Sequence, residues 1–306
     1  MAPGNSLCAA RSGGSHRRMF RTVEISDPRF EGEGLRFVTV QSPAIGGRAD
    51  LSLFVPPQAR GLRDVPLVIL LHGVYGSHWA WAFNGGAHRT AARMIVAKGL
   101  PPVVLAMPSD GLWRDGSGYV PHVLPEDPRR DPGMMMNQAK APADGTAAPD
   151  FERWIVDEVP LAAAAAATEI SPMSPLCLAG LSMGGFGALR LGGKHPHRFR
   201  AVSGHSSATH KEQFRELLGA RLDAWSDAEE DRSVLAAMLR NRHKLPPIRF
   251  DCGTEDFLVG ENRDLHQALE AADIAHMYEE FPGGHTWPYW EVHLADTFRF
   301  FARALR

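Results

Sequence analysis

The sequence is poor in cysteine, in net charge and in long hydrophobic runs. Its three cysteines among 306 residues are an odd number without a C-x-x-C pair, which argues against a disulfide framework and against a zinc site. The formal net charge is -2, so charge gives no reason to expect nucleic acid or an anionic membrane as a partner. No run of about 18 apolar residues occurs, so we expect no transmembrane helix. The histidines are scattered without metal-ligand spacing, and we expect neither metal nor cofactor.

The first 18 residues lack the apolar core of a secretory signal. We predict a disordered leader over 1–18, a cytoplasmic protein, and either Met1 or Met19 as the natural start. Residues 19–306, in a chain that is 44% hydrophobic, are enough for one domain with a full core. A homo-oligomer is compatible with this sequence, which does not decide the oligomeric state.

Strand and helix patterns alternate along the chain. Segments 19–26, 35–43 and 49–55 predict antiparallel strands that open the fold. Apolar runs at 66–71, 103–107, 176–179, 199–203, 248–252 and 276–281 predict further strands. Helical patterns cover 86–98, 151–169, 183–195, 208–219, 228–242, 261–272 and 290–305, with Pro160 interrupting the second. This alternation predicts an α/β fold with a mostly parallel central sheet, antiparallel N-terminal strands, and helices on both faces.

One segment has little periodicity. Residues 109–149 are rich in proline, glycine, aspartate and methionine. A loop this long inside a compact domain is usually functional or mobile, so we expect a loop or lid insertion here.

A tight turn at 180–184 (G-L-S-M-G) stands between a predicted strand and a predicted helix. A serine that attacks a carbonyl must stand clear of the sheet, and glycines two before and two after Ser182 allow the sharp turn that does this. The alternative is a glycine-rich turn of the kind found in any α/β protein. The strand before it and the helix after it favour a nucleophile elbow with Ser182 as the nucleophile.

A serine hydroxyl needs a base, and the base needs a carboxylate to orient it. Asp256 ends the D-C-G-T-E-D loop that follows the predicted strand at 248–252, and His285 follows the glycines at 283 and 284 after the next strand. The chain order Ser, Asp, His is the order of nucleophile-elbow hydrolases. Asp256 has a second interpretation, as the cap of the following helix.

Backbone N–H groups must stabilise the oxyanion that forms during such an attack. One predicted donor is Met183, directly after the nucleophile. The other belongs to the turn H-G-V-Y-G at 72–76, where Val74 is preferred over Tyr75.

Several motifs resemble those of one family. They are H-G-V-Y-G-S-H-W-A-W at 72–81, M-P-S-D-G at 107–111, G-L-S-M-G-G-F-G-A-L at 180–189, C-G-T-E-D-F-L at 252–258 and G-G-H-T-W-P-Y-W at 283–290. Over residues 19–306 the chain resembles the putative esterase family of α/β-hydrolases, with its S-formylglutathione hydrolases, carboxylesterases, feruloyl esterases and mycolyltransferases. The resemblance implies the same Ser182, Asp256 and His285 triad, with Val74 and Met183 as oxyanion donors.

The sequence thus predicts a serine carboxylesterase that hydrolyses short, small-molecule acyl esters. A glutathione thioester hydrolase is an alternative, although the 72–76 turn lacks the cysteine typical of that branch; an acyltransferase with the same triad and a non-catalytic binding module are others. Candidate pocket residues are Tyr75, Trp79, Trp81, Tyr119, His205 and Trp287, with packing as the alternative role.

Overall fold

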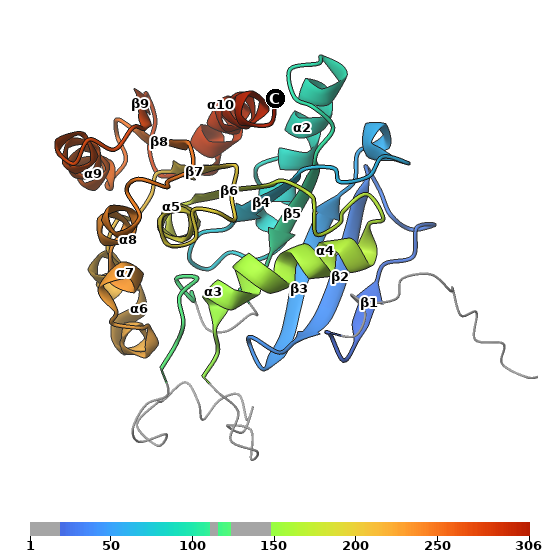
Figure 1. Ribbon diagram of the computed structural model, residues 1–306, viewed down its shortest axis with the longest axis horizontal. Helices are drawn as coiled ribbons and strands as arrows, with labels where there is room; N and C mark the ends of the chain where they lie inside the picture. Colours follow the sequence, from blue (N-terminus) through green and yellow to red (C-terminus); the bar gives the residue numbers. More distant parts are fainter. Residues whose placement is uncertain (1–18, 111–115, 124–147) are drawn as a thin grey trace, which may run out of the picture.

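A nine-stranded sheet organises the part of the chain that the computed structural model describes, residues 19–110, 116–123 and 148–306 (Figure 1). Its strand order is β1-β2-β3-β5-β4-β6-β7-β8-β9. The strands are β1 Val23–Ile25, β2 Leu35–Ser42, β3 Gly47–Phe54, β4 Leu67–Leu71, β5 Val104–Pro108, β6 Leu176–Leu181, β7 Ala201–His205, β8 Ile248–Gly253 and β9 Met277–Phe281.

The sheet changes from antiparallel to parallel along its width. Strands β1, β2, β3 and β5 pair antiparallel in that order. From β5 across β4 to β9 every pair is parallel, so these strands end at one common edge. The predicted mostly parallel sheet with antiparallel N-terminal strands is confirmed.

Helices lie between the strands along the chain. They are α1 Ala80–Phe83, α2 Ala87–Val96, α3 Phe151–Arg153, α4 Val159–Ala166, α5 Met183–Lys194, α6 Arg215–Leu218, α7 Glu229–Arg232, α8 Val234–Arg240, α9 Val259–Ala271 and α10 Trp287–Ala304. A π-helical turn, Trp154–Glu158, joins α3 to α4. Short 3₁₀ helices occur at Pro57–Ala59, Lys211–Phe214 and Gly219–Ala224.

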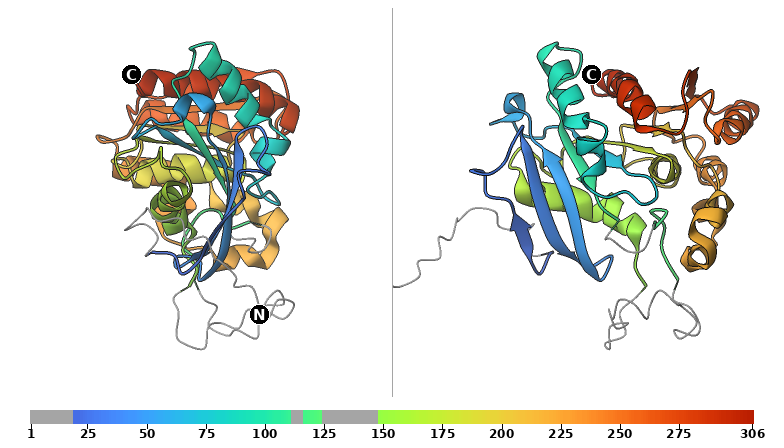
Figure 2. Two further views of the ribbon diagram at one scale, coloured as in Figure 1. Left: turned by 90° about the vertical axis from the view of Figure 1, so that its right-hand side faces the viewer. Right: turned by 180° about the vertical axis from the view of Figure 1, so that it is seen from behind.

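Along a buried strand, successive side chains point to opposite faces of the sheet and pack into two separate hydrophobic cores. In β4, Leu67, Ile69 and Leu71 enter one core, and Val68 and Leu70 enter the other. The first core contains residues of α4, α5, α8 and α9, and the second contains residues of α1, α2 and α10. Helices α2 and α10 lie side by side on their face in both figures, with α4 on the opposite face (Figures 1 and 2).

The prediction that Pro160 interrupts its helix is wrong. The chain continues from α3 through the π-helical turn into α4, with Pro160 near the start of α4. Proline has no N–H to donate to the carbonyl four residues earlier, which belongs to Val156. The Arg198 side chain donates to that carbonyl instead, at 2.6 Å. A π-turn and a basic side chain therefore accommodate the proline.

Two predicted helices are divided into shorter pieces. The 228–242 segment breaks into α7 and α8 at Ser233, whose backbone is extended and whose hydroxyl accepts the N–H of Ala236. In the 208–219 segment, His210 is extended and caps the 3₁₀ turn that begins at Lys211. Caps of this kind start new helices, which continuous helical periodicity does not reveal.

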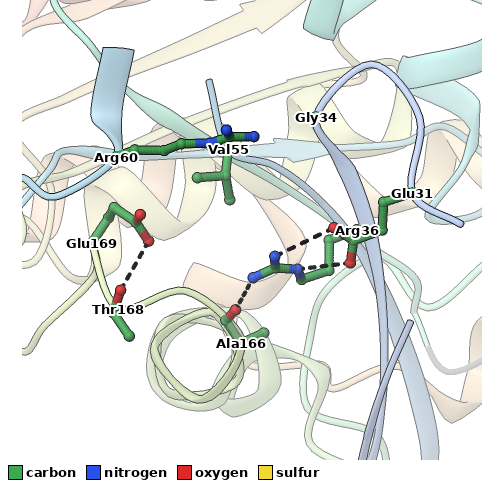
Figure 3. A pocket seen from close by; sticks show the side chains of 8 residues that line it. All are labelled: Glu31, Gly34, Arg36, Val55, Arg60, Ala166, Thr168 and Glu169. Atoms are coloured by element: carbon green, nitrogen blue, oxygen red, sulfur yellow. Dashed lines mark hydrogen bonds and ion pairs between the residues drawn. The ribbon is translucent and has the colours of Figure 1, made fainter. Parts of the chain in front are cut away.

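A polar cavity of about 260 Å³ lies between the start of β2 and the end of α4 (Figure 3). Arg36 of β2 extends across it, pairs with Glu31 and donates to the carbonyl of Ala166 at the end of α4 (Figure 3). These contacts join α4 to the antiparallel part of the sheet. None of the predicted site residues lines this cavity.

Candidate active site

Ser182 occupies a strained turn between β6 and α5. Its φ is 55° and its ψ is -116°, a conformation that non-glycine residues rarely adopt. A Cβ on Gly180 would lie 2.2 Å from the carbonyl oxygen of Gly184, and a Cβ on Gly184 would lie 2.3 Å from that of Leu71. Neither position has room for a side chain. The two glycines let α5 start directly against the ends of β4 and β6.

The turn after β4 faces the serine. A Cβ on Gly73 would lie 3.3 Å from the Cβ of Ser182. A Cβ on Gly116 would lie 2.7 Å from the sulfur of Met183 and 3.6 Å from a methyl carbon of Val74. The side chains of the two predicted donor residues thus both lie close to Gly116. Met183 is also the first residue of α5, where N–H groups have no acceptor within the helix.

Asp256 and His285 form a hydrogen-bonded pair. Nδ1 of His285 lies 2.9 Å from Oδ2 and 3.0 Å from Oδ1 of Asp256. The same carboxylate accepts the N–H of Leu258 at 2.9 Å, so Asp256 also caps the turn before α9, as its second interpretation predicted. Burial raises the pKa of Asp256, but the hydrogen bonds from His285 and Leu258 outweigh this and hold it below its ordinary value.

The loops that carry this pair are hydrogen-bonded to each other. The N–H of Thr254 donates to the carbonyl of Phe281, and that of Glu255 donates to the carbonyl of Gly283, both at 2.9 Å. A Cβ on Gly253 would lie 2.2 Å from the same Gly283 carbonyl. These backbone contacts fix the spacing of the two loops that carry Asp256 and His285.

This arrangement leaves one nitrogen of His285 available. An ionised Asp256 holds the imidazole proton on Nδ1, so Nε2 keeps its lone pair and can accept a proton from another group. The His285 side chain is 19% exposed, and that of Asp256 is fully buried. The imidazole of His285 is therefore accessible, while the carboxylate of Asp256 is shielded from water.

Three candidate pocket residues are buried in the interior, which contradicts the prediction that they line a pocket. Trp81 is buried and donates to the carbonyl of Leu71 at 2.9 Å. Tyr119 is buried against α5 and donates to the carbonyl of His72 at 3.0 Å. His205 is buried, with Nδ1 2.9 Å from Asp251. Each fixes a strand end, because its polar group needs a partner away from water.

The other candidates stay near the surface. Tyr75 is 65% exposed, and its hydroxyl reaches the carbonyl of Leu217 at 3.3 Å. Trp79 is exposed, and Trp287 is half-buried against the Trp81 ring. Phe257, which the sequence reading missed, is 69% exposed, with its ring centroid 4.5 Å from that of His285.

Sequence reasoning also missed the polar groups behind the pair. Asp251 contacts Arg249 and Tyr289 as well as His205, and these contacts outweigh burial and lower its pKa to about 2. Ser206 accepts a hydrogen bond from the indole N–H of Trp290 at 3.1 Å. Trp290 closes the G-G-H-T-W-P-Y-W motif, which was the one available signal, whereas nothing distinguished Ser206.

The predicted lid falls largely outside the described residues, which include 109–110, 116–123 and 148–149 of the 109–149 segment. The predicted leader, 1–18, lies outside them entirely. Within the described ranges, no group of three or more His, Cys, Asp or Glu side chains could hold a metal ion. No helix there has the length and apolarity to cross a bilayer.

The chain is similar to known esterases in sequence and in fold. An acetyl esterase of Caldicellulosiruptor saccharolyticus is 34% identical over 144 residues, which cover 41% of this chain and 54% of that protein. The chain thus matches about half the length of that relative. The fold is similar to that of a ferulic acid esterase, with a TM-score of 0.69, 19% identity, and coverage of 92% of this chain and 99% of the other.

An S-formylglutathione hydrolase from Agrobacterium tumefaciens also has a TM-score of 0.69, at 16% identity, and the match covers 94% of this chain and 99% of that one. At such identities the likeness shows the fold. Residues 42–301, which are most of the chain, match the family described as Putative esterase. The strand order, the elbow at Ser182 and this match lead to one conclusion: the chain belongs to the putative esterase family of α/β-hydrolases.

Proposed function

We propose that this protein is a serine carboxylesterase that hydrolyses small esters with short acyl groups. The observation that carries the proposal is the Asp256–His285 pair, joined at 2.9 Å in the loops after β8 and β9. In the parallel sheet these loops and the Ser182 turn emerge at the same edge. A nucleophile, a base and an orienting carboxylate at one edge are what acyl transfer to water requires.

The proposed reaction has two halves. Nε2 of His285 takes the proton of Ser182 as the serine oxygen attacks the ester carbonyl. The backbone N–H groups of Val74 and Met183 stabilise the resulting oxyanion, and His285 gives the proton to the departing alcohol. Water then attacks the acyl-enzyme, with His285 accepting its proton, and the carboxylic acid leaves as Ser182 regains its hydrogen.

The substrate class follows from the surroundings of His285. The exposed ring of Phe257 lies against His285, and the exposed Tyr75 belongs to the predicted oxyanion turn. Such groups favour an uncharged, apolar acyl ester over a highly charged substrate. The acetyl esterase among the relatives is consistent with a short acyl group.

The test is the Ser182→Ala variant with p-nitrophenyl acetate and butyrate as substrates. We expect kcat/KM to fall by at least ~10³-fold, because the nucleophile is absent, with thermal unfolding little changed. A fluorophosphonate probe should label the wild type and not the variant. Activity equal to wild type in Ser182→Ala, or a wild type that the probe does not label, would contradict the proposal.

A second experiment defines the acceptor and the leaving group. The wild type is offered p-nitrophenyl esters of increasing acyl length beside S-formylglutathione and methyl ferulate. We expect the highest kcat/KM with acetyl or butyryl esters. A preference for the thioester, or transfer to an added alcohol in excess of hydrolysis, would replace the carboxylesterase assignment with one of the alternatives that use the same triad.

A further inference from the structure

We propose that Tyr119 is a positioning residue for the oxyanion turn at 72–76. Its hydroxyl group, acting through His72, sets the direction in which the backbone N–H of Val74 points. This inference rests on the proposed function, since it concerns an N–H group that stabilises the oxyanion there. Tyr119 does not touch the substrate in this proposal and acts only through the backbone of the turn.

Tyr119 is fixed to α5, the helix that begins at the nucleophile turn. The residue is fully buried, and its φ is 56°, in the left-handed region that a bulky side chain rarely adopts. A Cβ on Gly187 of α5 would lie 2.6 Å from the Tyr119 ring, so the ring occupies the space that this glycine leaves. The buried guanidinium of Arg190, also in α5, donates to the carbonyl of Tyr119 at 2.6 Å. Both the ring and the backbone are thus held in place.

The Tyr119 hydroxyl reaches the end of β4. It donates to the carbonyl of His72, the residue that follows β4, at 3.0 Å. A carbonyl can only accept, so the tyrosine proton must be directed to it. Burial raises the pKa of Tyr119 well above its ordinary value, so the hydroxyl keeps that proton. The contact therefore requires the oxygen atom that phenylalanine lacks.

Two successive hydrogen bonds carry this constraint to Val74. Tyr119 fixes the carbonyl of His72, and Nδ1 of His72 donates to the carbonyl of Gly73 at 2.8 Å. A peptide unit is planar and trans, so its N–H points opposite to its carbonyl. The first bond therefore directs the N–H of Gly73, and the second directs the N–H of Val74. The rings of Tyr119 and His72 also meet edge to face, with centroids 5.9 Å apart.

A second contact ties the segment that carries Tyr119 to the same histidine. One oxygen of Asp110 accepts the N–H of Ser117 at 3.0 Å, and the other lies 3.8 Å from Nε2 of His72. The side chains of Asp110 and His72 are both buried. The histidine is thus held at its carbonyl by Tyr119 and faced at its ring by Asp110, which keeps Nδ1 turned toward Gly73.

The experiment compares wild type with Tyr119→Phe, which removes one oxygen atom. The readouts are kcat and KM for p-nitrophenyl acetate and Ki for an alkyl trifluoromethyl ketone. The Ser182 oxygen bonds to the ketone carbon, the serine proton passes to His285, and the carbonyl electron pair becomes an oxyanion. A donor that acts on the oxyanion stabilises the transition state and not the bound substrate. We therefore expect kcat to fall about tenfold, KM to stay within about twofold, and Ki to rise about tenfold.

The control is Tyr278→Phe, which removes the same atom from a tyrosine in β9. Its hydroxyl donates to Glu280 at 2.9 Å, so we expect kcat, KM and Ki to stay at their wild-type values. The alternative role for the Tyr119 hydroxyl is only to satisfy a buried carbonyl. In that case Tyr119→Phe would unfold at a lower temperature and keep the Ki of wild type.

The variants His72→Asn and His72→Ala test the second hydrogen bond. The amide nitrogen of asparagine takes nearly the place of Nδ1 and can donate to the carbonyl of Gly73, whereas alanine cannot. We expect His72→Ala to raise Ki at least as much as Tyr119→Phe does, and His72→Asn to recover most of that loss. If Tyr119→Phe does not fold, this pair decides the inference.

A folded Tyr119→Phe with the kcat and Ki of wild type would overturn the inference, and so would equal Ki values in the two His72 variants. The proposed function would survive either result if Ser182→Ala is inactive. If Ser182→Ala retains activity, the proposed function itself fails.

Discussion

The turn at Ser182 depends on two positions that have no side chain. Gly180 and Gly184 lie so close to neighbouring carbonyls that a Cβ at either would approach to 2.3 Å or less. The contacts are with backbone, which cannot move aside as the end of a flexible side chain can. The turn therefore depends on glycine for space, while Ser182 itself bears the positive φ.

At this scale we predict that Gly184→Ala is strongly disruptive. The new methyl group would press on the carbonyl of Leu71 and move the start of α5, which carries Met183. We expect a loss of about 3 kcal/mol in the free energy of unfolding and little esterase activity. Chemical denaturation and p-nitrophenyl acetate turnover measure the two effects.

Gly260→Ala is the matched control, since nothing lies within 4 Å of a Cβ at that position in α9. It should be neutral or stabilising by about 0.5 kcal/mol, because alanine is the better helix former. Equal stability in the two variants would show that the close approach at Gly184 is relieved without cost.

Hydrogen bonds between separate segments determine whether a helix continues and how far apart two loops lie. The α3–α4 segment remains continuous through Pro160 because a side chain from the loop after α5 replaces a missing helical hydrogen bond. In the same way, backbone hydrogen bonds between the loops after β8 and β9 set the spacing of Asp256 and His285. An element's local sequence predicts its type, and its neighbours decide whether it is continuous.

For the helical segment, we predict that Arg198→Met lowers the free energy of unfolding by about 1–2 kcal/mol. The buried carbonyl of Val156 would lose a charged donor at 2.6 Å that proline cannot replace. Urea titration followed by circular dichroism gives the value. Arg200→Met, at an exposed position on the same loop, is the control and should change stability by less than about 0.5 kcal/mol. An equal loss of unfolding free energy in both variants would contradict the proposed role of the Arg198 hydrogen bond.

At the scale of the whole molecule, a buried polar cluster forms around Asp251, near the carboxyl-terminal end of β8. Asp251 of β8 contacts His205 of β7, Arg249 of its own strand and Tyr289 of α10, so it joins two strands and a helix. Burial alone would raise its pKa, but these partners lower it from an ordinary 3.8 to about 2. The native state thus depends on this charge.

The pH dependence of folding follows from that shift. A carboxyl whose pKa is lower in the folded state contributes stability that is complete above the unfolded value of 3.8 and disappears as the pH falls to about 2. We expect the difference in unfolding free energy between wild type and Asp251→Asn to shrink by about 2 kcal/mol across this range. Denaturation at a series of pH values measures it.

Asp264→Asn, at an exposed position in α9, is the control and should differ from wild type by a constant amount. If the curves for wild type and Asp251→Asn stay parallel below pH 4, the charge of Asp251 does not contribute as predicted.

The sequence by itself determined the order and type of nearly all the strands, because buried strands leave uninterrupted apolar runs and a strained serine turn requires glycines at two fixed positions. It also placed Asp256 and His285 in neighbouring loops, since consecutive parallel strands end at the same edge. Only the tertiary structure decided which aromatic and polar side chains face the site and which fill the core. Trp81, Tyr119 and His205 are interior, whereas Ser206 and Trp290, 84 residues apart, are joined by a hydrogen bond. Such partners are chosen by packing between distant segments, which local periodicity does not encode.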